Sequence, residues 1–162
     1  MKKILVIGCP GSGKSCFSRA LHQKTGIELC HLDLLYWNAD KTTVERPIFL
    51  SRLSKILQRD AWIIDGNYAS SMEMRLAACD TVFFLDYPAA VCIDGVRARR
   101  GKERTDMPWI ETEEDAEFMA YIRSFEAENR PKILELLSKY EGKRVVVFRN
   151  RADADAFLQN GL

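Results

Sequence analysis

The eight residues GCPGSGKS at positions 8–15 constrain the fold of this chain more than any other part of its sequence. They match the pattern G-x-x-x-x-G-K-[S/T] at every fixed position. The apolar run KKILVI precedes them, and a stretch with helical spacing follows. The segment therefore joins a strand to a helix, and in that setting the pattern predicts a phosphate-binding loop rather than a chance glycine turn.

The chemistry of this loop follows from its residue types. Glycines let the backbone turn tightly, so that successive N–H groups point into one concavity beside the helix N-terminus. Lys14 is then expected to reach the β- and γ-phosphates of ATP, and the Ser15 hydroxyl to ligate Mg²⁺. The loop residues expected to bind the nucleotide are Gly8, Pro10, Gly11, Ser12, Gly13, Lys14, Ser15 and Cys16.

Apolar runs and helical segments alternate along the whole chain. Runs at residues 3–7, 28–32, 61–65, 81–85 and 144–148 are each expected to form a buried strand. Helical spacing occupies residues 14–24, 45–58, 71–79, 89–100, 113–140 with an interruption at Pro131, and 152–159. This order predicts a single α/β domain over residues 1–162, in three layers, with a parallel sheet between helices on both faces.

Composition limits the function classes. The chain has 162 residues, 47% hydrophobic and 29% charged, which is typical of one soluble globular domain. A net charge of +1 gives no general attraction to DNA or to an anionic membrane. The apolar run at the start is too short for a signal peptide, no stretch is long enough to span a membrane, and the five cysteines have no CxxC spacing. We therefore expect a cytoplasmic protein without a disulfide framework.

Two aspartates follow predicted strands at the edge of the sheet where the loop lies. Asp65 ends the run AWIID and is expected near Mg²⁺, directly or through water, or at the acceptor; the alternative is a turn residue before Gly66. Asp33, in HLDLLYW, is expected to bond the attacking hydroxyl or accept its proton; the alternative is a helix N-cap. Asp86 resembles a turn or cap residue and is placed outside the site.

About sixty residues separate the fourth and fifth strands, and a segment this long predicts a lid, at about residues 97–120. It begins with a basic cluster and continues with an acidic one. Without ligand, the acids are expected to pair with the arginines, and ATP phosphates to displace them. The basic cluster is Arg97, Arg99, Arg100, Lys102 and Arg104, and the acidic cluster is Glu111, Glu113, Glu114, Asp115 and Glu117. Arg123 and Arg130 are seven residues apart and are expected to share a helix face.

With the loop, HLDLLYW, WIIDGNY, RARRGKER and NRPKILELL in view, the chain resembles a group of P-loop kinase-like proteins. They are related to adenylate and shikimate kinases and are often labelled DNA topology modulation or adenylate kinase-like proteins. The resemblance implies a nucleoside-monophosphate-kinase type of fold, with five parallel strands in the order 2-3-1-4-5. It implies that Asp33 and Asp65 flank the acceptor, that Arg97 and Arg100 begin the lid, and that residues 149–152 lie near the adenine.

The chain departs from adenylate kinases in one motif. They carry DGFPR where this chain reads DGNYASSMEMR, so Arg75 is the candidate to replace their AMP-binding arginine. The name of the group suggests an effect on DNA topology, but the sequence has no basic stripe that would indicate direct binding of nucleic acid.

The leading hypothesis is transfer of the γ-phosphate from ATP to a small-molecule acceptor that resembles a nucleotide or nucleoside. The alternative is a non-catalytic regulatory protein that binds ATP and signals through lid closure. A GTPase switch is disfavoured because no N-K-x-D motif is present. The expected catalytic residues are Lys14, Asp33, Arg97 and Arg100; Arg97 and Arg149 are expected to contact ATP, and Ser15 and Asp65 the metal. The acceptor residues are expected to be Asp33, Trp37, Asn67, Tyr68, Arg75, Arg123 and Arg130.

Overall fold

The five apolar runs form one parallel sheet in the order β2-β3-β1-β4-β5, which confirms the predicted strand order. We describe it from a computed structural model that covers residues 1–162. The strands are β1 (Lys3–Gly8), β2 (Leu29–His31), β3 (Trp62–Asp65), β4 (Thr81–Leu85) and β5 (Arg144–Phe148). Parallel neighbours need crossover connections, and helices supply them here.

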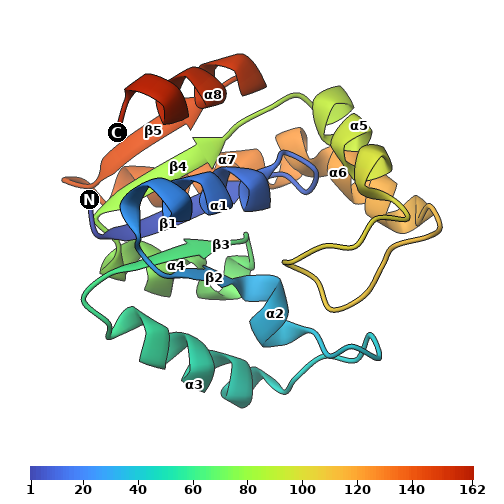
Figure 1. Ribbon diagram of the computed structural model, residues 1–162, viewed down its shortest axis with the longest axis horizontal. Coiled ribbons are helices and arrows are strands. Elements are labelled where there is room, and N and C mark those ends of the chain that lie inside the picture. The colour runs from blue at the N-terminus through green and yellow to red at the C-terminus, as the bar shows by residue number, and fades with distance from the viewer.

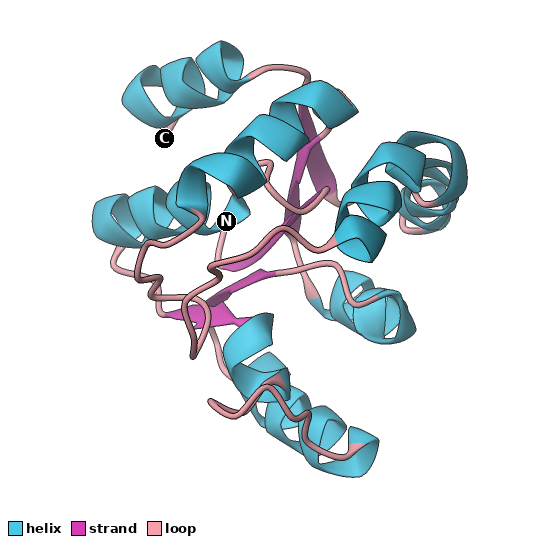
Figure 2. Cartoon of the chain, turned by 90° about the vertical axis from the view of Figure 1, so that its right-hand side faces the viewer, coloured by secondary structure: helices cyan, strands magenta, loops and turns pink.

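The helices cover both faces of the sheet. They are α1 (Lys14–Thr25), α2 (Leu32–Tyr36), α3 (Arg46–Leu57), α4 (Ala69–Ala78), α5 (Ala89–Arg99), α6 (Ala116–Glu128), α7 (Arg130–Lys139) and α8 (Arg151–Asn160). In Figure 1, α1 and α8 lie in front of the sheet, and α4 and α7 lie behind it. Figure 2 shows the sheet nearly edge-on between helices, which is the predicted three-layer arrangement. None of the helices combines the length and the apolar character that crossing a bilayer requires.

The central strands hold the core. Ile4, Leu5, Val6 and Ile7 of β1 are completely buried, because helices cover both sides of this middle strand. The whole of β3 and β4 is buried as well. A sheet packed on both faces fixes the carboxyl ends of its strands rigidly, and these ends carry the candidate site.

The sequence predicted that the fifth strand is buried, but most of it is exposed. β5 is an edge strand, and Val145 and Val147 on it are exposed. The apolar run of β5 resembles those of the central strands, but its place at the edge leaves part of it without a covering layer.

The boundaries of one helical segment and of one strand also differ from the prediction. The helical segment expected over residues 113–140, with an interruption at Pro131, is two helices, α6 and α7, that meet at Asn129, two residues earlier. Pro131 does not interrupt a helix but stands in the first turn of α7, where its missing N–H leaves no bond unmade. In β2 the strand ends at His31, and Leu32 already belongs to α2.

Candidate functional site

The predicted phosphate-binding loop runs from the end of β1 to the start of α1. Gly11 and Gly13 adopt φ values of 84° and 93°, which favour glycine over any other residue. At Gly11 a side chain is also excluded by space, since an added Cβ would lie 2.0 Å from the carbonyl oxygen of Cys92 in α5. Gly13 caps α1 without any side-chain hydrogen bond, and the first turn carries no acidic residue. The N-terminal amides of α1 are therefore free for an anion, as a phosphate site requires.

Three side chains hold this loop in place. Asn67, after β3, accepts a hydrogen bond from the Gly8 amide and donates one to the Gly8 carbonyl, at 3.1 and 2.6 Å. Arg151, at the start of α8, donates to the carbonyls of Ser12 and Gly11 at 2.8 and 2.9 Å. The Lys14 ammonium group folds over the loop and donates to the Gly8 carbonyl at 2.9 Å. The loop is thus organised before any ligand binds.

A single large cavity of about 1340 Å³ lies beside the loop. Small-molecule sites usually occupy about 300–1,000 Å³, so this cavity has room for a nucleotide and a second ligand. Its lining contains, from the predicted nucleotide residues, Pro10, Gly11, Gly13, Lys14, Ser15 and Cys16, and, from the predicted acceptor and metal residues, Asp33, Trp37, Asp65, Asn67 and Tyr68. The predicted nucleotide residues and the predicted acceptor residues, which are distant in sequence, therefore line the same cavity.

Asp33 lies in this cavity next to Tyr68. It is the second residue of α2, and His31 caps the helix, so the N-cap alternative for Asp33 is wrong. The Tyr68 hydroxyl donates a hydrogen bond to the Asp33 carboxylate. Burial raises the pKa of Asp33, while the Tyr68 bond and the charge of Lys14 oppose this in part. A carboxylate with a raised pKa is better suited to accept a proton near neutral pH.

Asp65 is paired in a way that the sequence did not reveal. The Nδ1 atom of His31 lies 2.6 Å from a carboxylate oxygen of Asp65, and both residues are buried. The two residues stand side by side in the register of β2 and β3, which explains the contact. Burial lowers the pKa of Lys14, and the negative charges of Asp65 and Asp33 offset part of this effect.

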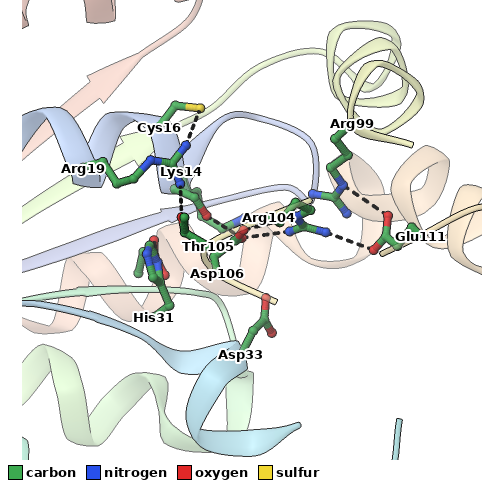
Figure 3. Close-up of polar contacts among 12 residues, drawn as sticks. Lys14, Cys16, Arg19, His31, Asp33, Arg99, Arg104, Thr105, Asp106 and Glu111 are labelled. Carbon is green, nitrogen blue, oxygen red and sulfur yellow. Dashed lines mark hydrogen bonds and ion pairs between the residues drawn. The ribbon is translucent and has the colours of Figure 1, made fainter. Parts of the chain in front are cut away.

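The segment predicted as a lid, at about residues 97–120, contains the connection between α5 and α6, residues 100–115 (Figure 1). Many residues of this connection line the cavity, and we call it the lid below. The predicted pairing of acids with arginines is confirmed for two acids. Glu114 binds Arg97 and Arg100 at 2.9 and 3.1 Å. Glu111 binds Arg99 and Arg104 at 3.3 and 3.0 Å (Figure 3). Asp115 instead caps α6, accepting from the amides of Glu117 and Phe118.

No family model and no curated protein matches this sequence. Solved structures do match along the whole chain. The shikimate kinase of Acinetobacter baumannii in complex with shikimate aligns with a TM-score of 0.66 at 18% identity, over 98% of this chain and 89% of its own. The shikimate kinase of Bacteroides thetaiotaomicron aligns with a TM-score of 0.59 at 19% identity, over 96% and 93%.

A sugar kinase of Janibacter sp. HTCC2649 aligns with a TM-score of 0.57 at 15% identity, over 100% of this chain and 92% of its own. This chain has the P-loop kinase fold. The structural alignments establish the fold, but identities this low say nothing about the substrate of this chain. The finer resemblance to DNA topology modulation proteins is not confirmed by these matches and stays a prediction.

Within the P-loop kinase fold, several predicted arginines lie outside the cavity. Arg97 is exposed and binds only Glu114, whereas Arg99, Arg100 and Arg104 line the cavity. The expected pair Arg123 and Arg130 does not share a helix face, because Arg123 is on α6 and Arg130 on α7.

Arg130 and Arg149 are held by one buried carboxylate. Both guanidinium groups bind Asp86, the residue after β4, and neither lines the cavity. Asp86 is therefore the anchor of an ion-pair cluster rather than a plain turn residue. In the segment after β5, Arg151 rather than Arg149 reaches the cavity. The sequence analysis placed residues 149–152 near the nucleotide, and Arg151 lies in this segment. Local sequence could not show whether Arg149 or Arg151 points into the cavity, because this depends on where α8 begins.

Sequence reasoning missed other residues of the cavity. Trp109 in the lid packs edge-on against Trp37, a predicted acceptor residue, with ring centroids 5.2 Å apart. Asp106 lies in the lid, two residues after Arg104, the last residue of the basic cluster. A carboxylate so close to these arginines could have been considered as a site residue from the sequence. Apolar side chains of α6 and α7 complete one wall of the cavity: Phe118, Met119, Phe125, Ile133 and Leu136.

Arg75 is completely buried and does not line the cavity. Its guanidinium group donates to the Gly66 carbonyl at 2.8 Å, to the carbonyls of Asn67 and Tyr68, and to the Ser71 hydroxyl at 3.3 Å. The arginine thereby shapes the loop that carries Asn67 and Tyr68. Its contacts favour a positioning role over direct contact with an acceptor.

Replacing Arg75 by methionine is expected to lower the free energy of unfolding by about 3–5 kcal/mol, because buried carbonyls lose their partner. Urea denaturation followed by circular dichroism measures this. Arg123→Met is the matched control: Arg123 is exposed, and its loss should cost no more than about 0.5 kcal/mol. Equal stability of the two variants would contradict the structural role of Arg75.

Proposed function

We propose that this protein binds ATP with Mg²⁺ and transfers the γ-phosphate to a small-molecule acceptor that resembles a nucleotide or nucleoside. The observation that carries the proposal is the shared cavity, in which Lys14 of the phosphate loop and the Asp33 carboxylate line one enclosure. Phosphoryl transfer requires mainly that donor and acceptor are positioned together and that developing charge is neutralised.

Each part of the cavity supports one role. The free amides of α1 and the Lys14 ammonium group suit the phosphates of ATP. Asp33, with its raised pKa, suits removal of the proton from an attacking hydroxyl. Arg99, Arg100 and Arg104 of the lid suit the charge that develops on the transferred group, and they replace Arg97 in our assignment. Trp37, Asn67 and Tyr68 suit the body of the acceptor.

The residues also fit a magnesium ion. The Ser15 hydroxyl lines the cavity where loops of this type hold the metal, and Asp65 lines it too. Bound there, the ion would neutralise charge on the β- and γ-phosphates.

The test is mass spectrometry of a metabolite extract incubated with ATP, Mg²⁺ and the protein. We expect one or more compounds to gain a phosphoryl group, and the same extract with the Lys14→Ala variant to lack them. Tight ATP binding with no phosphorylated product from the extract or from a panel of nucleosides, nucleotides and sugars would replace this proposal by the non-catalytic regulatory alternative.

A further inference from the structure

The lid places a carboxylate directly on the hydroxyl of the phosphate loop. The Ser15 Oγ atom donates a hydrogen bond of 2.6 Å to the Oδ2 atom of Asp106. These residues are 91 positions apart in sequence, and Asp106 is buried to 6% exposure. Asp106 therefore brings a carboxylate of the lid to the residue expected to ligate magnesium.

Arg104 holds this carboxylate in place. Its guanidinium group binds both oxygens of Asp106, at 3.1 and 2.8 Å, and reaches Glu111 at 3.0 Å with its remaining nitrogen. Burial would raise the pKa of Asp106, but the bonds from Arg104 and Ser15 outweigh it and hold this pKa well below its usual range. Asp106 is therefore a charged and oriented carboxylate inside the cavity.

Such a carboxylate has the chemistry of a magnesium ligand. Mg²⁺ binds oxygen atoms at about 2.0–2.1 Å and takes one or two protein groups beside phosphates and water. The Ser15 and Asp106 oxygens are close enough to be neighbouring ligands of one such ion. Asp65, the carboxylate predicted for this task, contacts His31 through its Oδ2 atom, so Asp106 would be a second carboxylate beside this ion.

We propose that Asp106 is a magnesium ligand carried by the lid, which joins Ser15 on the ion and makes lid closure depend on the metal. The inference rests on the proposed binding of ATP. In this arrangement the ion adds a link between the lid and the phosphate loop, so the metal favours closure of the lid over the nucleotide and the approach of the lid arginines to the phosphates.

The surroundings of Asp106 provide a readout of the lid. Thr105 accepts a hydrogen bond from Arg19 of α1 at 2.9 Å, and Trp109 packs on Trp37. A lid that moves when the metal binds changes the environment of Trp109. Tryptophan fluorescence therefore follows lid position without any need for turnover.

The experiment is a titration with Mn²⁺, followed by electron paramagnetic resonance, of the full chain saturated with ADP. Asp106→Asn keeps the size of the side chain and should weaken Mn²⁺ binding about 10–100-fold. Its affinity for ADP in EDTA should change by less than about 3-fold, and its metal-dependent change in tryptophan fluorescence should be lost. Glu111→Gln is the matched control, since it touches the same Arg104 but not Ser15, and it should bind Mn²⁺ like the wild type.

The Asp106→Asn substitution could alter the whole lid, and a double-mutant cycle with Ser15→Ala tests this case. If Ser15 and Asp106 bind one ion, the double variant loses less Mn²⁺ affinity than the product of the two single fold-losses. Unchanged or tighter Mn²⁺ binding by Asp106→Asn overturns the inference, and tighter binding would make Asp106 a competitor of the ion. A wild type that binds ADP but not ADP with Mn²⁺ also overturns it, whereas a wild type that binds no nucleotide at all removes the proposed function itself.

Discussion

Replacing Lys14 by alanine is expected to weaken ATP binding by about 10- to 100-fold. Hydrogen bonds between charged groups contribute about 1.5–3 kcal/mol each, and about 1.4 kcal/mol corresponds to a factor of ten in affinity. In the structure the Lys14 ammonium group bonds only to loop carbonyls, at 2.9 and 3.3 Å, so no ion pair of the fold depends on it. Asn67 and Arg151 still hold the loop in the variant, so the loss should appear mainly in binding rather than in folding.

Isothermal titration calorimetry with ATP and Mg²⁺ measures this loss, and a thermal melt measures folding. Lys24→Ala is the control, because Lys24 is an exposed lysine in the last turn of the same helix. It should bind ATP like the wild type. If Lys14→Ala keeps full affinity, the loop does not bind the triphosphate as we propose.

Replacing Asp33 by asparagine is expected to lower the rate of phosphoryl transfer by about 10²–10⁴-fold, the usual contribution of a positioned general base. Asparagine keeps the size of the side chain and can still bond to Tyr68, but it cannot take a proton. Affinity for ATP should change little, because the phosphates bind on the loop. Single-turnover transfer to an acceptor found by mass spectrometry, beside calorimetry with ATP, separates these two effects.

The pH profile provides a second check on Asp33. A base must be deprotonated to act, so the transfer rate should fall as the pH is lowered through the raised pKa of Asp33. Burial, followed by the charge of Asp33, raises the pKa of Tyr68, which therefore stays protonated as the donor in this pair. Because that bond lowers the pKa of Asp33, Tyr68→Phe should shift the acid limb of the profile to higher pH. An unshifted limb would show that another group limits the rate.

Most of the fold was predictable from local patterns. The apolar runs identified the strands, and the helical segments between them required parallel neighbours. The strand order itself came from the resemblance to P-loop kinases, since no local pattern says that β1 lies between β3 and β4. The exposure of Val145 and Val147 was not predictable, because an edge strand and a central strand have the same apolar sequence pattern.

The site divides in the same way. The phosphate loop and the positions of Asp33 and Asp65 at one edge of the sheet follow from residues adjacent in sequence, so a motif and a strand end suffice to find them. The arginines of the site were harder to predict, because several candidate arginines carry the same charge and only their partners in the folded chain distinguish them. Asp86 holds Arg130 and Arg149, and backbone carbonyls hold Arg75.

The chain's local sequence was thus enough to predict a strand, a glycine loop and a helix in the arrangement of a phosphate site, since each depends on neighbours within a few residues. Contacts between distant segments were decided only by the folded chain. His31 meets Asp65 through strand register, and Asp106 meets Ser15 across 91 positions because the lid returns over the loop. The chemical type of a side chain determines which interactions it can make, but the packing and topology of the chain determine which partner lies beside it.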